Sequence, residues 1–404
     1  MDMFFTTSRS LKFLLALFSF SLLVACIGVP RQSAVPKNLT ARAQIEGMPG
    51  IRYFVDSAEG IQNFTIDAQK LESVHVGSAL ADASYLSLSG GGDNGAFGAG
   101  LLVGWTQRGD RPSFKLVTGV STGALMAPFA YLGSEYDSVL TKLYTTTNTA
   151  DIYVTRNIFS GVMDDSLVSD HPLKVLLDQY IDSSLLEKIA HEYVVNRRAL
   201  LIGTTDIDAG QPVVWNMGQI ASIGGPQALS LFKQVMLASA SVPVLFPPVM
   251  FDVMVNNLAY QEMHVDGGAS TQVFLYPYAV SVDSVKMGIP FEKKRRAFII
   301  RNDKLSSSWE DTERWSVAIA LRSVEQIIEK QGNGDLLKIY DITKKDGVEF
   351  NLAYIDQDFE MKSQSMFDTQ YMQALFNYGQ AKARAGYPWA HSLPTLNARN
   401  HSLR

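Results

Sequence analysis

Residues 85–102 read Y-L-S-L-S-G-G-G-D-N-G-A-F-G-A-G-L-L, and residues 114–125 read F-K-L-V-T-G-V-S-T-G-A-L. Each segment begins with a short apolar run that predicts a buried strand, Tyr85–Ser89 in the first and Phe114–Thr118 in the second. A glycine-rich turn and then an Ala/Leu-rich segment typical of a helix follow in both. Two strand–turn–helix units in tandem predict parallel strands joined by crossover helices, and therefore an α/β fold.

The second turn carries a candidate nucleophile. Gly119 to Gly123 fits the pattern G-x-S-x-G, a sharp strand-to-helix turn that lifts the hydroxyl of Ser121 above the sheet. Glycines are expected on both sides because a side chain there would collide with a neighbouring strand or helix, and because strained backbone angles cost glycine least. This pattern indicates nucleophilic catalysis.

The first turn carries candidate hydrogen-bond donors. Gly90, Gly91 and Gly92 precede a helix that is expected to start near Gly95, and bare N–H groups at a helix N-terminus suit a developing oxyanion. Phosphate binding is disfavoured, because the chain has no G-K-[S/T] here and lacks the G-x-G-x-x-G context of a dinucleotide site. The two turns together favour acyl transfer.

Composition sets wider limits. The chain has 404 residues, 47% of them hydrophobic and 19% charged, which is enough for a sizeable core in one large domain or two smaller ones. The formal net charge is -5 with no long basic block, so nucleic acid is not expected as a partner. A single cysteine cannot form a disulfide within the chain.

The N-terminus resembles a secretory leader. Arg9 and Lys12 precede an apolar run, residues 13–25, that is shorter than the roughly 20 residues of a spanning helix. The run ends in L-V-A-C, which resembles the bacterial lipobox and implies cleavage before Cys26 and acylation of that residue. The alternative is an ordinary signal peptide in which Cys26 is accidental. Ile27, rather than Asp, resembles lipoproteins sorted to the outer membrane.

These features predict a bacterial cell-envelope protein that is lipid-anchored, with the outer membrane as the expected location. Residues 1–25 would be the signal peptide, and the Pro-rich, polar residues 26–38 would be a tether.

Two later segments allow a functional or a structural interpretation. Asp206 and Asp208 could form a metal pair, but a hairpin turn is favoured because no further ligand completes a set. The run A-S-A-S-V-P-V-L-F-P-P at 238–248 is either a helix stop or the wall of an acyl pocket, with Leu245 and Phe246 as candidate lining.

The general base is predicted to be a carboxylate. Asp266 stands at the end of a predicted strand and is followed by two glycines, which leave room for close approach. A Ser-His-Asp triad in α/β-hydrolase order would need His391 or His401, both in a polar tail, and His264 is expected to be a bystander. The sequence therefore favours Asp266 as the partner of Ser121.

The ordered set of the glycine turn, the Ser121 elbow, residues 238–248 and Asp266-Gly267-Gly268 resembles the patatin-like phospholipase family over residues 85–301. The resemblance implies a three-layer α/β/α sandwich with a mostly parallel central sheet and a Ser–Asp dyad of Ser121 and Asp266. It also implies an oxyanion hole from the amides of Gly90, Gly91 and Gly92, and hydrolysis of fatty acyl esters of phospholipids or related lipids. No metal or cofactor is needed.

On this basis residues 39–84 form an N-terminal extension, residues 85–301 the catalytic domain, and residues 302–404 a mainly helical region packed on the core.

The chain departs from the family at the first turn. The family commonly has Arg or Lys before the last glycine, where this chain has Asn94 preceded by Asp93. We expect one of these side chains to cap the helix that begins near Gly95 and to point away from the site. The departure leaves open a second function, a lipoprotein of the same fold that only binds lipid or a protein partner. The basic run 293–296 is expected to be a solvated loop, with anionic headgroups as the alternative.

Overall fold

The computed structural model describes residues 29–72, 82–155, 165–280, 294–307, 309 and 311–394. The predicted signal peptide, Cys26 and His401 lie outside these residues. No helix in the described part is long and apolar enough to cross a bilayer.

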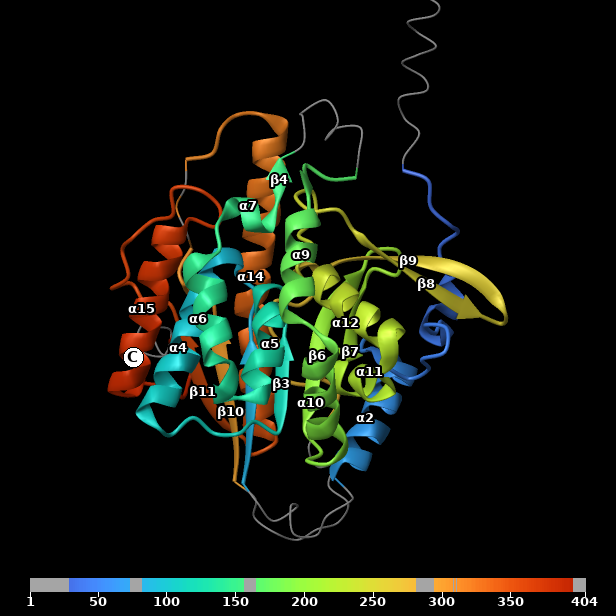
Figure 1. Ribbon diagram of the computed structural model, residues 1–404, viewed down its shortest axis with the longest axis horizontal. Helices are drawn as coiled ribbons and strands as arrows, with labels where there is room; N and C mark the ends of the chain where they lie inside the picture. The colour runs from blue at the N-terminus through green and yellow to red at the C-terminus, as the bar shows by residue number, and fades with distance from the viewer. Residues whose placement is uncertain are drawn as a thin grey trace, which may run out of the picture.

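One large sheet organises the molecule (Figure 1). In the described part of the chain its nine strands are β1 (Arg52–Phe54), β2 (Ala83–Leu88), β3 (Leu116–Gly119), β6 (Ala199–Asp206), β7 (Gln211–Asn216), β8 (Val249–Val255), β9 (Leu258–Asp266), β10 (Arg295–Arg301) and β11 (Glu349–Tyr354). Strands β11, β10, β2, β3 and β6 are parallel neighbours in that order. Strands β7 and β9 both pair antiparallel with β6, β1 pairs with β7, and β8 pairs with β9. The sheet is therefore mixed, with a parallel centre.

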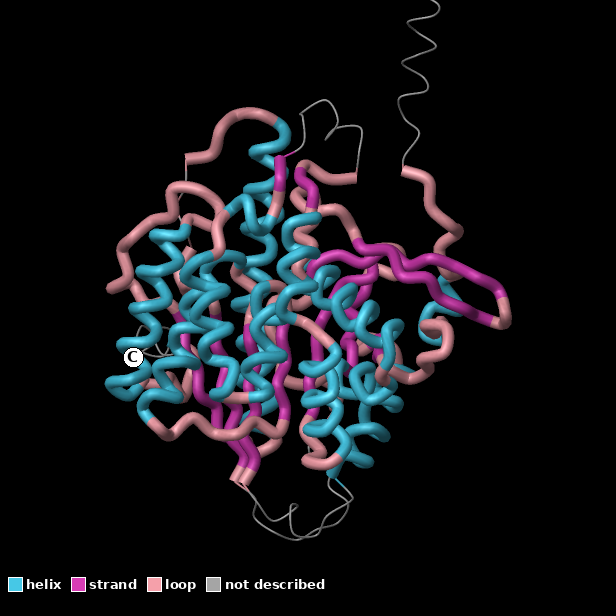
Figure 2. Tube along the Cα trace, in the orientation of Figure 1, coloured by secondary structure: helices cyan, strands magenta, loops and turns pink. Residues whose placement is uncertain are grey.

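Helices cover both faces of this sheet, which confirms the α/β sandwich (Figure 2). They are α2 (Ala58–Glu72), α4 (Gly95–Arg108), α5 (Thr122–Leu132), α6 (Asp137–Thr146), α7 (Thr149–Ile152), α9 (His171–Tyr180), α10 (Ser183–Val194), α11 (Met217–Ile223), α12 (Gly225–Ser239), α14 (Ser316–Lys345) and α15 (Thr369–Gly386). In Figure 1, α5, α6 and α10 lie in front of the sheet and α14 lies behind it.

The alternation of strand side chains produces two separate cores. Leu86 and Ile300 belong to the cluster under the front helices, whereas Tyr85 and Ile299, one residue away, belong to the cluster that includes Ile339 of α14. Successive side chains of a strand point to opposite faces, so a strand buried on both faces reads as a continuous apolar run.

The C-terminal region is built into the same body. Strand β11 extends the sheet beyond β10, and α15 packs closely on α4. A Cβ at Gly100 of α4 would lie 2.0 Å from the carbonyl oxygen of Phe376 in α15, so only glycine permits this helix contact.

The N-terminal segment is also attached. Arg31 donates two hydrogen bonds to Asp208, at 2.9 and 2.6 Å, and the Ser33 carbonyl accepts from Gln261 N–H at 3.0 Å. The residues predicted as a tether, 26–38, are therefore bound to the sheet from Arg31 onward. A local composition rich in Pro and polar residues does not reveal such long-range partners.

Candidate active site

Ser121 occupies a strained turn between β3 and α5. Its backbone has φ 55° and ψ −126°, angles that a residue with a side chain rarely adopts. A Cβ on Gly119 would lie 2.5 Å from the carbonyl oxygen of Gly123, and a Cβ on Gly123 would lie 2.3 Å from that of Leu88. The flanking glycines are thus required for space, as expected, but the backbone strain lies on the serine itself.

A second serine fixes this turn. The amide of Ser121 donates to Ser239 Oγ at 3.0 Å, and the Ser239 hydroxyl donates to the carbonyl of Gly203 at 2.7 Å. Ser239 is the last residue of α12 and is fully buried. The sequence reasoning missed this role, although a hydroxyl inside the small-residue run 238–241 was the available signal.

Asp266 stands at the end of β9, which pairs with β6, the neighbour of β3. Its Oδ1 accepts a hydrogen bond from the Gly268 amide at 2.7 Å. Its buried Oδ2 accepts no hydrogen bond from the described residues. Burial raises the pKa of Asp266 to about 7, against the opposing effects of the Ser121 hydroxyl and the Gly268 amide. The structure therefore brings Ser121 and Asp266 together.

The glycine turn contributes fewer free donors than predicted. The amide of Gly90 donates to the carbonyl of Gln272 at 3.1 Å, so Gly90 is not available to an oxyanion and that part of the prediction is corrected. Within the described chain, the amides of Gly91 and Gly92 have no acceptor. These two residues have φ values of 152° and 57°, and Gly92 is exposed.

Asn302, the residue after β10, holds the glycine turn in place through hydrogen bonds to residues before and after it. Its backbone N–H donates to Ser89 Oγ, and its side-chain Nδ2 donates to the Ser89 carbonyl, both at 2.8 Å. Its side-chain Oδ1 accepts a hydrogen bond from the Gly98 N–H of α4 at 3.1 Å. A Cβ on Gly91 would lie 2.1 Å from the Asn302 carbonyl oxygen. A fully buried Asn at the carboxyl end of a strand was the signal that the sequence reasoning did not use.

Asp93 and Asn94 do not cap α4, contrary to expectation. No side chain among the described residues caps this helix. The Asp93 carboxylate instead accepts the Phe367 amide at 3.3 Å, and Asn94 Oδ1 accepts the Tyr371 hydroxyl. Burial raises the pKa of Asp93 to about 6, while the amide of Phe367 opposes that rise. Both residues therefore tie the glycine turn to the C-terminal segment that leads into α15.

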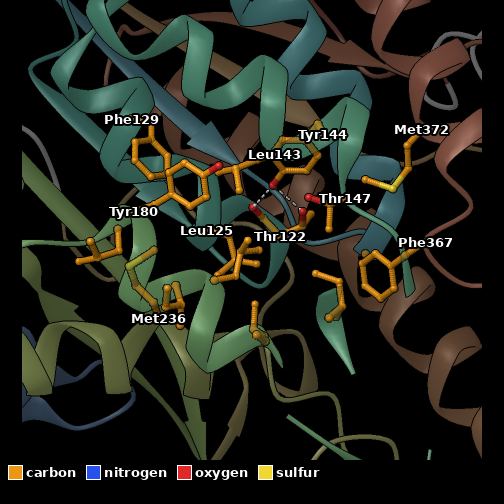
Figure 3. A pocket seen from close by; sticks show the side chains of 16 residues that line it. Thr122, Leu125, Phe129, Leu143, Tyr144, Thr147, Tyr180, Met236, Phe367 and Met372 are labelled. Atoms are coloured by element: carbon orange, nitrogen blue, oxygen red, sulfur yellow. Dashed lines mark hydrogen bonds between the residues drawn. The ribbon is translucent and has the colours of Figure 1, made fainter. Parts of the chain in front are cut away.

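An apolar pocket begins beside these turns (Figure 3). Gly92 and Thr122 line it together with side chains from α5, α6 and α9, and the Thr122 and Tyr144 hydroxyls bond each other at 2.8 Å. The remaining lining residues are Leu125, Phe129, Leu143, Thr147, Ile152, Leu173, Leu176, Leu177, Tyr180, Ile181, Met236, Phe367 and Met372. Most of these side chains are apolar, which suits an acyl chain.

The candidate lining residues Leu245 and Phe246 do not line this pocket. Both are buried in the front core, and Phe246 packs edge-on against Tyr153 with ring centroids 5.9 Å apart. Helix packing places α5, α6 and α9 around the pocket instead, which the local pattern at 238–248 does not specify.

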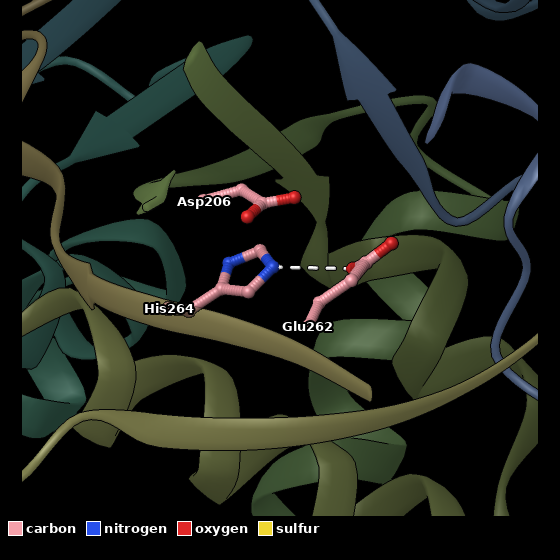
Figure 4. A group of neighbouring side chains, drawn as sticks. All are labelled: Asp206, Glu262 and His264. Atoms are coloured by element: carbon pink, nitrogen blue, oxygen red, sulfur yellow. Dashed lines mark hydrogen bonds and ion pairs between the residues drawn. The ribbon is translucent and has the colours of Figure 1, made fainter. Parts of the chain in front are cut away.

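Figure 4 shows the group formed by Asp206, Glu262 and His264, whose ligand atoms lie within 4.8 Å of one another. Each is already bonded: His264 contacts Thr204 Oγ1 at 2.9 Å and Glu262 at 3.2 Å, and Glu262 binds Arg52. With both ring nitrogens engaged, the group is a satisfied polar network and does not suit a metal ion.

Asp206 and Asp208 have the structural role that the sequence favoured. Asp206 Oδ1 accepts the amides of Asp208 and Ala209, at 3.0 and 3.1 Å, and so closes the turn between β6 and β7.

The described histidines do not complete a triad with Ser121. His391 Nδ1 contacts the carbonyl of Phe350 at 3.2 Å near the start of β11, whereas Ser121 follows the end of β3. His264 belongs to the polar network.

Comparison with known proteins gives one family match. Residues 86–277 match the family model described as Patatin-like phospholipase. Among solved structures, the crystal structure of VipD from Legionella pneumophila is 12% identical, with 76% of this chain and 67% of that chain covered and a TM-score of 0.36. A search of curated proteins found no match. The family assignment supports a lipid acyl hydrolase.

Proposed function

We propose that the protein is a serine acyl hydrolase that cleaves fatty acyl esters of phospholipids or related lipids. The observation that carries the proposal is the pairing of Ser121, on its strained elbow, with a buried carboxylate whose Oδ2 is otherwise unbonded among the described residues. A carboxylate with a pKa of about 7 is suited to take a proton near neutral pH. The adjoining apolar pocket supports an acyl chain as the bound group.

In the proposed mechanism, Asp266 accepts the hydroxyl proton as Ser121 attacks the ester carbonyl. The amides of Gly91 and Gly92 stabilise the oxyanion, and one such donor is typically worth about 10²–10³ in rate. Collapse of the tetrahedral intermediate breaks the ester C–O bond; the leaving oxygen takes the proton back from Asp266 and departs as the alcohol, which leaves an acyl-enzyme on Ser121 and Asp266 deprotonated again. Water, deprotonated by Asp266, then hydrolyses the acyl-enzyme and releases the fatty acid.

We also propose that Cys26 is acylated and anchors the protein in the bacterial outer membrane. The support is the L-V-A-C sequence after an apolar run, with Ile27 in the following position. Cells that express the Cys26→Ser variant should incorporate no labelled fatty acid into the protein, and unchanged labelling would refute the anchor.

Purified protein and its Ser121→Ala and Asp266→Asn variants test the hydrolase directly. Free fatty acids released from phospholipid vesicles are measured by mass spectrometry, and circular dichroism checks the fold. We expect Ser121→Ala to abolish release and Asp266→Asn nearly to do so. A folded Ser121→Ala protein with full activity would falsify the proposal. Lipid binding without hydrolysis by the wild type would favour the lipid-binding alternative.

A further inference from the structure

Three exposed apolar side chains stand close to the mouth of the pocket. Val154 follows α7 on β4 (Val154–Thr155), Val244 lies in the loop after α12, and Met366 precedes α15. Their exposed fractions are 55%, 39% and 43%. We call these three side chains the rim.

The rim is one patch because its segments meet around Tyr153. The Tyr153 ring contacts Phe246 and Phe367 edge-on, with centroids 5.9 and 6.3 Å apart. Thr149 Oγ1 also donates to the carbonyl of Met366 at 2.7 Å. The segment that carries Val154 therefore touches the segments of both other rim residues.

Two of these segments, those of Val154 and Met366, also line the pocket. Ile152 and Phe367, each next to or near a rim residue, are among its lining side chains. An acyl chain that leaves the pocket on this side would therefore meet the apolar rim.

Two of the segments contain a residue with a strained backbone conformation. Val244 has φ 73° and Phe367 has φ 56°, which is rare for β-branched or bulky residues. Such strain persists only where surrounding contacts fix the conformation, and it gathers at sites that bind ligands. Val244, one of these two residues, is exposed to solvent.

The N-terminal anchor constrains which side faces the lipid. The chain is bound to the body from Arg31, so only residues 26–30 separate an acylated Cys26 from the fold. Five residues span at most about 18 Å. In Figure 1 the described chain begins at the same end of the molecule as β4 and α7. A lipid anchor would therefore hold this end against the bilayer.

We infer that the rim inserts into the surface of a lipid bilayer, so that a substrate acyl chain passes from the membrane into the pocket without crossing water. The inference rests on the proposed function for its catalytic consequence. The insertion itself is a binding property, because apolar side chains at the bilayer interface are stabilised by removal from water.

The depth of single labelled positions tests the insertion without reference to catalysis. Val154→Cys, Val244→Cys and Met366→Cys are made in the full acylated chain, in which Cys26 is the sole native cysteine. Each is labelled with an environment-sensitive fluorophore and reconstituted in phosphatidylcholine vesicles that carry a quenching lipid. Val195→Cys is the matched control, since Val195 is also a valine with 55% exposure but lies after α10 beside the start of β6. We expect quenching at the three rim positions and none at Val195. Rim probes that behave like the Val195 probe would overturn the inference.

Activity gives an independent readout. Val154→Asp and Met366→Asp should each lower hydrolysis of vesicle lipid by about tenfold or more, because each places a charge where an apolar side chain would enter lipid. Hydrolysis of a water-soluble short-chain ester should not change. Equal losses on both substrates would contradict the inference. If the wild type cleaves neither substrate, the proposed function fails. The quenching experiment still shows whether the rim inserts into the bilayer.

Discussion

Replacing Asp266 by Asn should make the folded protein more stable and almost inactive. Burial raises the folded-state pKa of this carboxyl from 3.8 to about 7. The folded state therefore binds more protons than the unfolded state between pH 4 and 7, and the free energy of unfolding falls as the pH rises through that window. A shift of about three pKa units corresponds to about 4 kcal/mol lost above pH 7. The amide that replaces the carboxyl would carry no charge to bury, and its oxygen could still accept the Gly268 N–H.

Urea unfolding at pH 5 and pH 8 measures this effect. Linkage predicts that the stability advantage of Asp266→Asn grows by about 2.5 kcal/mol between the two pH values, because the wild-type carboxyl is still largely protonated at pH 5. The exposed Asp110, which pairs with Arg108 at 3.3 Å, supplies the control variant Asp110→Asn for the loss of one carboxylate. An advantage that is the same at both pH values, or a variant less stable than the wild type at pH 8, would show that burial does not raise the pKa of Asp266.

The same geometry leads to expectations for pH dependence, backbone strain and support of the elbow. The value of kcat/KM on a neutral ester should rise about tenfold per pH unit below pH 7 and level off above it, since Asp266 acts as a base only when deprotonated; a flat profile from pH 5 to 8 would contradict this. Ser121→Gly should be more stable than Ser121→Ala by about 1 kcal/mol in urea, because glycine relieves the strain at φ 55°; equal stabilities would show that the turn is unstrained. Ser239→Ala should lower kcat by about tenfold or more with little change in KM, because the Ser121 amide loses its acceptor. An unchanged kcat would show that Ser239 does not position Ser121.

Local patterns predicted the parts of the site that are local. The strand–turn–helix units, the elbow at Ser121 and the carboxylate at the end of a strand are specified by residues a few positions apart, and the helix expected after the elbow is α5. Parallel strand order brings the glycine turn after β2 and the elbow after β3 to one edge of the sheet, whereas Asp266 reaches the site from β9, which runs antiparallel to β6.

Long-range contacts account for what local patterns missed. Gly90 gives its amide to Gln272, Ser239 receives the amide of Ser121, and Asn302 holds the glycine turn from another strand. Each partner is more than a hundred positions away, so strand order and helix packing decide the contact. Asp93 has a sequence position typical of a helix cap, yet its carboxylate accepts the amide of Phe367 instead. The sheet is also mixed, because the hairpin at 206–211 returns β7 beside β6, and β9, which forms a second hairpin with β8, runs antiparallel to β6.

Labelling with a fluorophosphonate reports whether Asp266 activates Ser121, because only an activated serine reacts with this reagent. We expect the wild type to be modified at Ser121, as located by peptide mass spectrometry, and the Asp266→Asn variant to react far more slowly. Modification at another residue, or equally fast labelling of the Asp266→Asn protein, would contradict it.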